Sequence, residues 1–205
     1  MGKTYNKDET KKKLISAVGE ILLEDGFSEL GINSIAKKAG VNKVLIYRYF
    51  DGLEGLYQKF AESIDPFNKI SSELENIIKK NKPAFPEMAM FAFSSIMAVV
   101  DNNEILAEVM RWEISSTNSI IRIFEEKREE SGMNIMRMIV SHYELPPSMD
   151  LAAIASLFTA GLIYLSIRSN RIDMYNGIPI REDEGKERLL SVIKKSIEGM
   201  MIASE

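Results

Sequence analysis

Apolar residues recur at steps of three and four along most of the chain, the spacing that places them on one face of an α-helix. No stretch alternates apolar and polar residues over enough positions to predict a strand. Prolines and glycines mark many of the predicted ends, because neither suits a helix interior. Residues 171–183 form one long irregular stretch with an Asn-Gly turn signal. We therefore predict an all-α protein, with helices near residues 8–25, 32–39, 43–50, 54–63, 67–81, 86–100, 103–113, 116–142, 148–169 and 184–202.

Two of these helices are short and follow one another closely. INSIAKKA (32–39) and KVLIYRYF (43–50) meet at a turn around Gly40, where glycine can adopt a positive φ angle without steric cost. Ala36 lets the two helices approach closely, and Ile46 and Phe50 face the first helix. This is the layout of a helix-turn-helix, whose second helix lies in the major groove of DNA.

The remaining positions of the second helix have side chains suited to DNA. At about 100° per residue, Val44, Leu45 and Arg48 point outward and the others lie on the flanks. Arg48 can donate two hydrogen bonds to guanine, and the two apolar residues can contact a thymine methyl. Lysine and tyrosine hydroxyls suit phosphate oxygens. The predicted DNA-binding residues are Lys43, Val44, Leu45, Tyr47, Arg48 and Tyr49. The alternative is that the tyrosines are ordinary half-buried helix residues.

Charge is unevenly distributed along this acidic chain, whose net charge is −4. Residues 1–60 carry ten Lys or Arg and eight Asp or Glu, whereas residues 61–205 carry sixteen and twenty-two. Five lysines, at positions 3, 7, 11, 12 and 13, lie near the N-terminus. A basic head on an acidic body is consistent with a head that meets a polyanion, and equally with a solvated lysine face.

The segment FSELGINSIAKKAGVNKVLIYRYFDGLEGLYQKF (27–60) resembles the DNA-binding region of the tetracycline-repressor-type (TetR) transcriptional regulators. The similarity covers residues 8–60, where the isoleucine-alanine pair, the alanine-glycine-valine turn, the tyrosine and the terminal phenylalanine have the family's spacing. The resemblance implies a helical homodimer with a DNA-binding domain over 1–52 and a ligand-binding and dimerisation domain over 53–205. It also implies regulation, most often repression, through an operator and a small inducer.

The sequence departs from the family pattern at several positions. Gly31 stands where a threonine usually caps the second helix, and glycine offers no side-chain acceptor. Val44 and Leu45 replace the usual glycine-threonine pair, and Tyr49 replaces the usual histidine. Leu53 stands where a lysine usually contacts a phosphate. The amide groups at the start of that helix can still face a phosphate.

Residues 151–167, LAAIASLFTAGLIYLSI, contain no charged residue. This length is at the short edge of the roughly 17–25 residues that span a bilayer. We favour a helix buried on all sides of a soluble protein, and predict no membrane association. The N-terminus is polar, with no apolar run typical of a signal peptide, and there are no cysteines. We therefore expect a cytoplasmic protein without disulfides.

The larger C-terminal region contains material for a ligand cavity. Aromatic residues and methionines lie on several different predicted helices, and methionine adapts its shape to varied apolar partners. Either an apolar or amphipathic ligand pocket or simply a methionine-rich core fits this composition. Trp112 and Tyr164 are the first candidates, and His142 is a polar candidate. The predicted ligand-binding residues are Phe91, Met97, Met110, Trp112, Phe124, His142, Phe158 and Tyr164.

The last two long helices carry a predicted dimer interface. Small residues repeat every four positions along helix 148–169, which gives a strip on which another helix can lie. The last helix adds an apolar stripe, so two copies can form a four-helix bundle. The predicted interface residues are Ala152, Ser156, Ala160, Leu190, Ile193 and Ile197.

Catalytic signatures are absent from the sequence. There is no Walker loop, GxGxxG or HExxH motif, and His142 is the only histidine. With no second histidine or cysteine, we expect no metal site, no cofactor and no enzyme activity. The sequence thus predicts a ligand-responsive DNA-binding regulator that binds a pseudo-palindromic operator as a homodimer. The alternative is a helical small-molecule-binding protein or enzyme whose head has lost specific DNA recognition.

Overall fold

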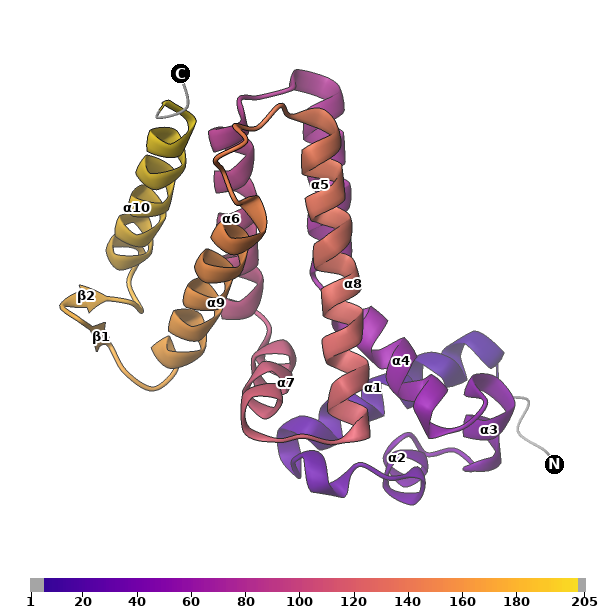
Figure 1. Cartoon of the computed structure of the whole chain (residues 1–205). Helices are drawn as coiled ribbons and strands as arrows, with labels where there is room; N and C mark the ends of the chain where they lie inside the picture. The colour runs from indigo at the N-terminus through magenta and orange to yellow at the C-terminus, as the bar shows by residue number, and fades with distance from the viewer. Residues whose placement is uncertain (1–5, 203–205) are drawn as a thin grey trace. The chain divides into compact units, whose positions relative to one another are not determined.

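The computed structural model describes residues 6–202 of the chain. These residues form ten α-helices, one short 3₁₀ helix and one two-stranded antiparallel hairpin (Figure 1). The elements are α1 (Lys7–Glu24), η1 (Phe27–Glu29), α2 (Ile32–Lys38), α3 (Val44–Phe50), α4 (Leu53–Ile64), α5 (Phe67–Asn81), α6 (Phe85–Asp101), α7 (Glu104–Ser115), α8 (Ser119–His142), α9 (Leu151–Ser169), β1 (Met174–Tyr175), β2 (Ile178–Pro179) and α10 (Asp183–Ile202).

The all-α fold class is confirmed, and every predicted helix is present with ends that differ by only a few residues. The hairpin is the main element that the sequence pattern does not predict. Its strands are two residues long, too short for a visible alternation of apolar and polar residues. The turn between them uses Asn176 and Gly177, whose φ angles are 49° and 77°. Positive φ at both positions is typical of the tight turns that join hairpin strands.

The chain divides into two compact units that do not follow the expected division after residue 52. The first unit takes the chain up to Asp65 together with Glu104–Glu129, and the second takes Pro66–Asn103 together with the chain from Glu130 onward. The helix α4 belongs to the first unit because Leu56, Tyr57 and Phe60 lie in its core. The first unit therefore extends beyond the helix-turn-helix. Of the five N-terminal lysines, Lys3 lies outside the described residues.

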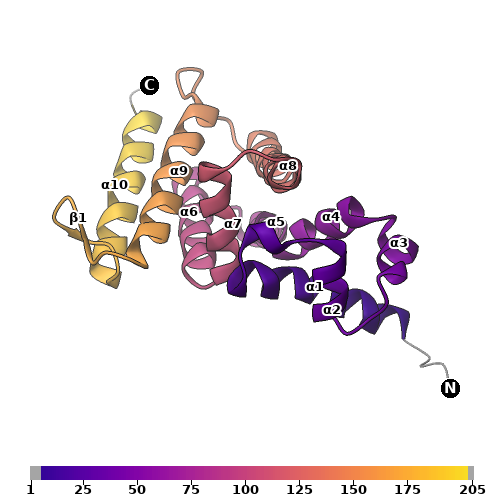
Figure 2. The same ribbon diagram turned by 90° about the horizontal axis from the view of Figure 1, so that it is seen from below.

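In the first unit, α1 is the central helix. It contacts α2 and α4, and α3 contacts α4, as the two views show (Figures 1 and 2). Its inward stripe includes Leu14, Val18 and Ile21, each at most 2% exposed. Ile35 of α2 and Ile46 of α3 are both fully buried in the same core. The crossing of α2 and α3 is therefore fixed by apolar packing.

In the second unit, α6 is the central helix and contacts α5, α9 and α10. Its buried side chains include Met88, Ala89 and Ile96, which pack in one cluster with residues of the surrounding helices. Ile70 and Leu74 of α5 belong to the same cluster and are at most 1% exposed. This core accounts for much of the methionine and phenylalanine content of the region.

Contrary to the expectation that residues 151–167 are buried on all sides, much of α9 is exposed in the single chain. Among the described residues it is the one helix long and apolar enough to span a bilayer, with mean hydropathy 1.7, but only 17% of that window is buried. Leu162 and Ile167 face the core, while Leu157 is 74% exposed. One side of α9 thus packs within the second unit, and the other side presents apolar residues outward.

Candidate nucleic-acid interface

The turn between α2 and α3 has the geometry predicted from its glycine. Gly40 adopts a φ angle of 66°, in the left-handed region. The Val41 N–H donates to the Ala36 carbonyl at 3.0 Å, and the Gly40 N–H donates to the Lys37 carbonyl at 3.1 Å. These bonds satisfy carbonyls at the end of α2 and reverse the chain tightly.

The start of α2 is capped despite the glycine at its N-cap position. The Ser34 hydroxyl oxygen accepts a hydrogen bond from the Gly31 N–H at 3.0 Å. That hydroxyl also lies 2.6 Å from the Glu29 carbonyl oxygen, to which it donates. Ser34, three residues into the motif, therefore supplies part of the capping that Gly31 lacks.

The start of α3 is organised by two asparagines that the sequence pattern did not single out. The Asn42 side-chain oxygen accepts from the Val44 N–H at 2.9 Å, which caps the first turn of α3. Asn33 of α2 accepts a hydrogen bond from the Lys43 ammonium at 3.3 Å. This bond links exposed Lys43, at the start of α3, to α2.

The predicted DNA-binding residues divide into an exposed group and a half-buried group. Val44 and Tyr47 are 59% and 60% exposed, and Lys43 and Arg48 are also exposed. Leu45 and Tyr49 are half-buried and pack against the core of the first unit. The inward positions Ile46 and Phe50 are 0% and 8% exposed, as the helical wheel predicts. Leu45 therefore presents less of its side chain than its predicted outward position suggests.

The end of α3 is held close to the start of α4. Asp51 and Gly52 have φ angles of 61° and 111°, which turn the chain sharply. A Cβ at Gly55 would lie 1.9 Å from the Phe50 carbonyl oxygen, so a side chain cannot fit there. Leu53 is half-buried against the core, so it offers no polar replacement for the family's lysine. The first amides of α4 are placed directly beside α3.

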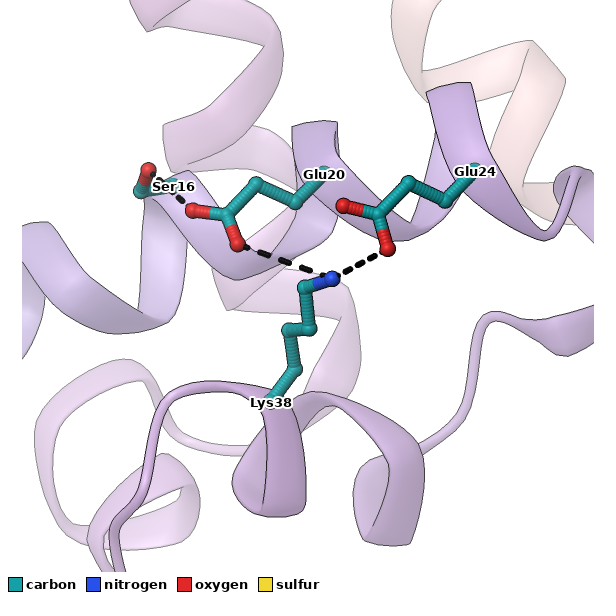
Figure 3. A network of polar contacts seen from close by, with 4 residues as sticks. All are labelled: Ser16, Glu20, Glu24 and Lys38. Carbon is teal, nitrogen blue, oxygen red and sulfur yellow. Dashed lines mark hydrogen bonds and ion pairs between the residues drawn. The ribbon is translucent and has the colours of Figure 1, made fainter.

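A polar network joins α2 to α1 (Figure 3). The Lys38 ammonium of α2 pairs with Glu24 and lies 3.8 Å from the Glu20 carboxylate oxygen, both on α1. Ser16 donates to Glu20 at 3.0 Å. The hydrogen bond to Glu24 raises the pKa of Lys38 above its ordinary value. The network supplements the apolar contact between the two helices at their exposed edge.

The eight predicted ligand-binding residues do not gather within either unit. Met110, Trp112 and Phe124 lie in the first unit, where Trp112 contacts Phe27 with ring centroids 5.8 Å apart. The core of the second unit contains Met97, with Phe91 and Phe158 packed against it. Tyr164 is 44% exposed, and His142 is exposed at the end of α8. The predicted ligand-binding residues are thus divided between the two units.

Two buried polar atoms in the first unit have no hydrogen-bond partner within the described chain. They are the Tyr57 hydroxyl of α4 and the Trp112 indole N–H of α7. Burial raises the pKa of Tyr57 to about 12. An unpaired buried polar atom costs about 1–3 kcal/mol, so each of these atoms favours a polar partner. Tyr57 was not among the predicted residues, because it reads simply as part of the inner stripe of α4.

The predicted dimer residues also separate into two groups. Ala152, Ser156 and Ala160 are exposed on α9. Leu190 is half-buried, but Ile193 and Ile197 of α10 are 5% and 1% exposed. The last two belong to the core of the second unit, where α10 packs on α6, and therefore do not face a second copy.

Known proteins match both the N-terminal segment and the whole fold. Residues 14–60 match the family model of bacterial regulatory proteins, tetR family. The chain is 24% identical over 175 residues to the HTH-type transcriptional regulator SrpR of Pseudomonas putida. The aligned residues cover 79% of this chain and 77% of SrpR.

Solved structures of regulators share the arrangement over nearly the full length. NalD of Pseudomonas aeruginosa, the secondary repressor of the MexAB-OprM multidrug efflux pump, superposes with a TM-score of 0.67 at 16% identity over 94% of this chain and 98% of NalD. FadR of Bacillus subtilis, solved with stearoyl-CoA, gives 0.64 at 17% identity over 93% and 97%. Residues 14–60 are therefore similar to the N-terminal segment of the tetR family of bacterial regulatory proteins, and the whole chain has the fold of these solved regulators.

Proposed function

We propose that this protein is a transcriptional regulator that binds a pseudo-palindromic operator as a homodimer and responds to an apolar or amphipathic small molecule. The observation that carries the proposal is the exposed face of α3. Val44, Tyr47 and Arg48 lie there with Lys43 beside them, on a helix locked into a helix-turn-helix by buried Ile35 and Ile46. A helix presented in this way enters the major groove.

The exposed residues have separate roles in this proposal. Arg48 and Val44 contact bases, the first by hydrogen bonds and the second by apolar contact. Lys43 and Tyr47 contact phosphates, because an ammonium and a hydroxyl suit phosphate oxygens. Half-buried Leu45 and Tyr49 contribute less area to the DNA and more to the position of α3. The Asn33 side chain, which holds Lys43, belongs to the same surface.

The proposed homodimer rests on the exposed side of α9. A helix of mean hydropathy 1.7 with 17% of its window buried leaves apolar surface that water disfavours. Leu157 stands among Ala152, Ser156 and Ala160, and these small neighbours allow a second helix to approach closely. Packing against a second copy covers this surface and brings two recognition helices to one operator.

The proposed ligand contact rests on the buried polar atoms of the first unit. The Tyr57 hydroxyl and the Trp112 indole lie in an otherwise apolar core and have no partner within the described chain. In this proposal a polar group on a mainly apolar ligand pairs with at least one of these two atoms. The FadR structure with stearoyl-CoA shows that a regulator with this fold binds an amphipathic molecule. The ligand of this chain is proposed by chemical class only.

Binding to operator DNA is tested with the sequence immediately upstream of the gene. Fluorescence anisotropy of that duplex and of a random duplex of equal length is measured from about 50 to 200 mM salt. We expect specific binding at least about a thousandfold tighter than random binding at one salt concentration. Equal affinity for the two duplexes would overturn the specific-regulator proposal. It would favour the alternative, a small-molecule-binding protein without DNA recognition, which Leu53 in place of a lysine supports.

Ligand binding is tested through Trp112, the only tryptophan of the chain. Stearoyl-CoA is titrated as the probe, with coenzyme A as the control that lacks the acyl chain. We expect saturable quenching by stearoyl-CoA and a rise in melting temperature. The Tyr57→Phe variant removes one buried hydroxyl with little change in shape and should alter the affinity. If stearoyl-CoA raises the melting temperature of Tyr57→Phe and of Trp112→Phe by as much as it raises that of the wild type, this placement is wrong.

A further inference from the structure

A groove on the first unit lies between the start of α4 and the start of α8, and we call it the α4–α8 groove. Its volume is about 760 Å³, within the roughly 300–1,000 Å³ typical of small-molecule sites. Glu54 of α4 forms one side, and residues 117–119 with side chains of the first two turns of α8 form the other. All of these residues belong to the first unit. None of the predicted DNA-binding or ligand-binding residues lines this groove.

Apolar packing holds together the two helices that form the α4–α8 groove. Phe60 of α4 and Phe124 of α8 pack edge-on, with ring centroids 5.8 Å apart. Ile121 lines the groove, is 1% exposed and belongs to the same core as both rings. Half-buried Ile123 also lines it. The groove therefore has an apolar floor whose shape is set by the core beneath it.

The loop before α8 is ordered by hydrogen bonds, which also occupy amides at the start of that helix. The Asn118 side-chain oxygen accepts from the Ile120 and Ile121 N–H groups at 2.9 and 3.0 Å. The Ser116 N–H donates to the Trp112 carbonyl at 2.9 Å. Free amides at a helix start attract anions, but two of those of α8 are already bound by its cap. The start of α8 therefore offers an anion less than an uncapped helix would.

Carboxylates give the α4–α8 groove a negative charge. Glu54 and Glu125 are both exposed, and neither forms an ion pair within the described residues. The charge of Glu126 is compensated by Arg122, whose Nε lies 2.7 Å from its carboxylate. Two uncompensated charges thus stand on different helices, beside apolar surface. In the part of the chain that the structure describes, no three histidine, aspartate or glutamate side chains gather as ligands of one metal ion.

We propose that the α4–α8 groove binds an organic diamine, whose two ammonium groups pair with Glu54 and Glu125. Its methylene chain lies over Ile121 and Ile123, which removes apolar surface from water. An ammonium group has three N–H donors and no acceptor, so it complements a carboxylate. A dianion of equal length, or a nucleic acid, is repelled by the same two carboxylates. This site goes beyond the proposed function, since its occupation requires neither DNA nor the proposed amphipathic ligand.

Binding is tested on the full chain with octamethylenediamine as the probe, titrated by calorimetry. Suberate is the control, because it has the same apolar chain between two carboxylates. We expect saturable binding of the diamine that weakens as salt rises, since exposed charges are screened, and no binding of suberate. Amide chemical shifts measured by NMR should change most at residue 54 and residues 117–126. Larger changes elsewhere on the chain would overturn the proposed site.

The double variant Glu54→Gln/Glu125→Gln removes both charges with little change in side-chain shape. We expect the affinity for octamethylenediamine to fall at least about fivefold. The matched control is Glu62→Gln/Glu129→Gln, which removes two charges from the same helices outside the groove and should keep the wild-type affinity. Equal affinity in the two double variants would overturn the proposal. Displacement of the diamine by an equal concentration of Mg²⁺ would assign the carboxylates to a metal ion and would also overturn it.

Discussion

Both α3 and α9 expose apolar side chains, but their neighbours differ in charge. On α3, Val44 and Tyr47 are 59% and 60% exposed and lie beside Lys43 and Arg48. On α9, Leu157 is 74% exposed, and no charged residue occurs between Asp150 and Arg168. Exposed apolar surface by itself marks an interaction site without identifying the partner. The charges beside it distinguish the two helices.

The proposed partners, a DNA groove for α3 and a second copy for α9, explain this difference, because each partner replaces water in its own way. A major groove offers phosphates on its walls and polar base edges on its floor, so α3 needs cations and hydrogen-bond donors around a few apolar contacts. An apolar helix face packed on its own copy replaces water with carbon, and a charge there would be buried without a partner. The same chain therefore uses two kinds of exposed surface.

The largest effect should come from placing a charge on the uncharged helix. In Leu157→Glu, the twofold interface receives one carboxylate from each copy, and such a like-charge contact costs several kcal/mol. We expect the dimer dissociation constant to rise about a thousandfold, since each 1.4 kcal/mol is a factor of ten. Sedimentation equilibrium measures this change, and circular dichroism should show unchanged helix content.

The matched control for this variant is Met133→Glu, which places the same charge on an exposed methionine of α8. Its dimer dissociation constant should equal that of the wild type. If both variants dimerise normally, α9 is not the interface. The proposal that α9 binds a second copy, in contrast to α3, would then be wrong.

The next largest effect should come from removing the cation of α3. A two-pronged arginine contact is worth about 1–3 kcal/mol, and the dimer makes it twice. We expect Arg48→Ala to weaken operator binding at least about thirtyfold, with less than about a tenfold loss for random duplex. Anisotropy titrations against both duplexes measure the difference. Arg137→Ala, which removes an exposed arginine of the second unit, should change neither affinity.

An equal loss for operator and random duplex would assign Arg48 to a phosphate instead of a base. Dimerisation should be unaffected in either case. The two surfaces are then distinguishable, because Arg48→Ala weakens DNA binding and leaves dimerisation intact, whereas Leu157→Glu breaks the dimer and thereby also weakens binding to a two-half-site operator.

The sequence predicts α3 better than α9, for a physical reason. In α3 the partner's chemistry is visible in the residue types, since cations and tyrosines interrupt an otherwise apolar helix. The spacing around Gly40 places them on a helix-turn-helix, and the positive φ angle at Gly40 agrees with that prediction. The hydrogen bond between Lys43 and Asn33 depends on the crossing of two helices, which single-helix patterns do not contain.

For α9, composition cannot distinguish a helix buried in one chain from a helix buried between two chains. Both are apolar all round, and only packing shows that Leu162 faces inward while Leu157 does not. The reverse error occurred on α10, where Ile193 and Ile197 looked like interface residues and belong to the core. The hairpin was not predicted because its two strands have only two residues each, too few to show an alternation of apolar and polar residues.

A smaller effect should come from the lysine at the edge of α3. Lys43→Ala removes one phosphate contact from each copy, and each contact contributes about 0.9 to the slope of log affinity against log salt concentration. We expect the slope to fall by about two for the dimer, with unchanged preference among operator sequences. Lys69→Ala, at an exposed position of α5, is the control and should leave the slope unchanged. A changed preference at one base pair would show that Lys43 reads a base.

The smallest effect should come from Lys38→Met, which tests what holds the helix-turn-helix in position. The ion pairs with Glu24 and Glu20 join α2 to α1, but they are exposed, and exposed pairs contribute little. Buried Ile35 and Ile46 fix the same crossing. We therefore expect a slight decrease in melting temperature and unchanged operator affinity. Lys59→Met is the control, since Lys59 pairs with Glu62 within a single helix.

The pH dependence of the Lys38→Met effect has a definite sign. Because Glu24 raises the pKa of Lys38, the stabilisation from the pair is fully present below the ordinary value of 10.5 and is lost as pH rises through the raised pKa. The difference in melting temperature between wild type and Lys38→Met should therefore be constant from neutral pH to about pH 10 and should close above it. If Lys38→Met instead weakens operator binding as much as Arg48→Ala, the exposed charges position α3. The binding surface of α3 would then depend on charged residues for its orientation as well as for its chemistry, unlike the surface of α9.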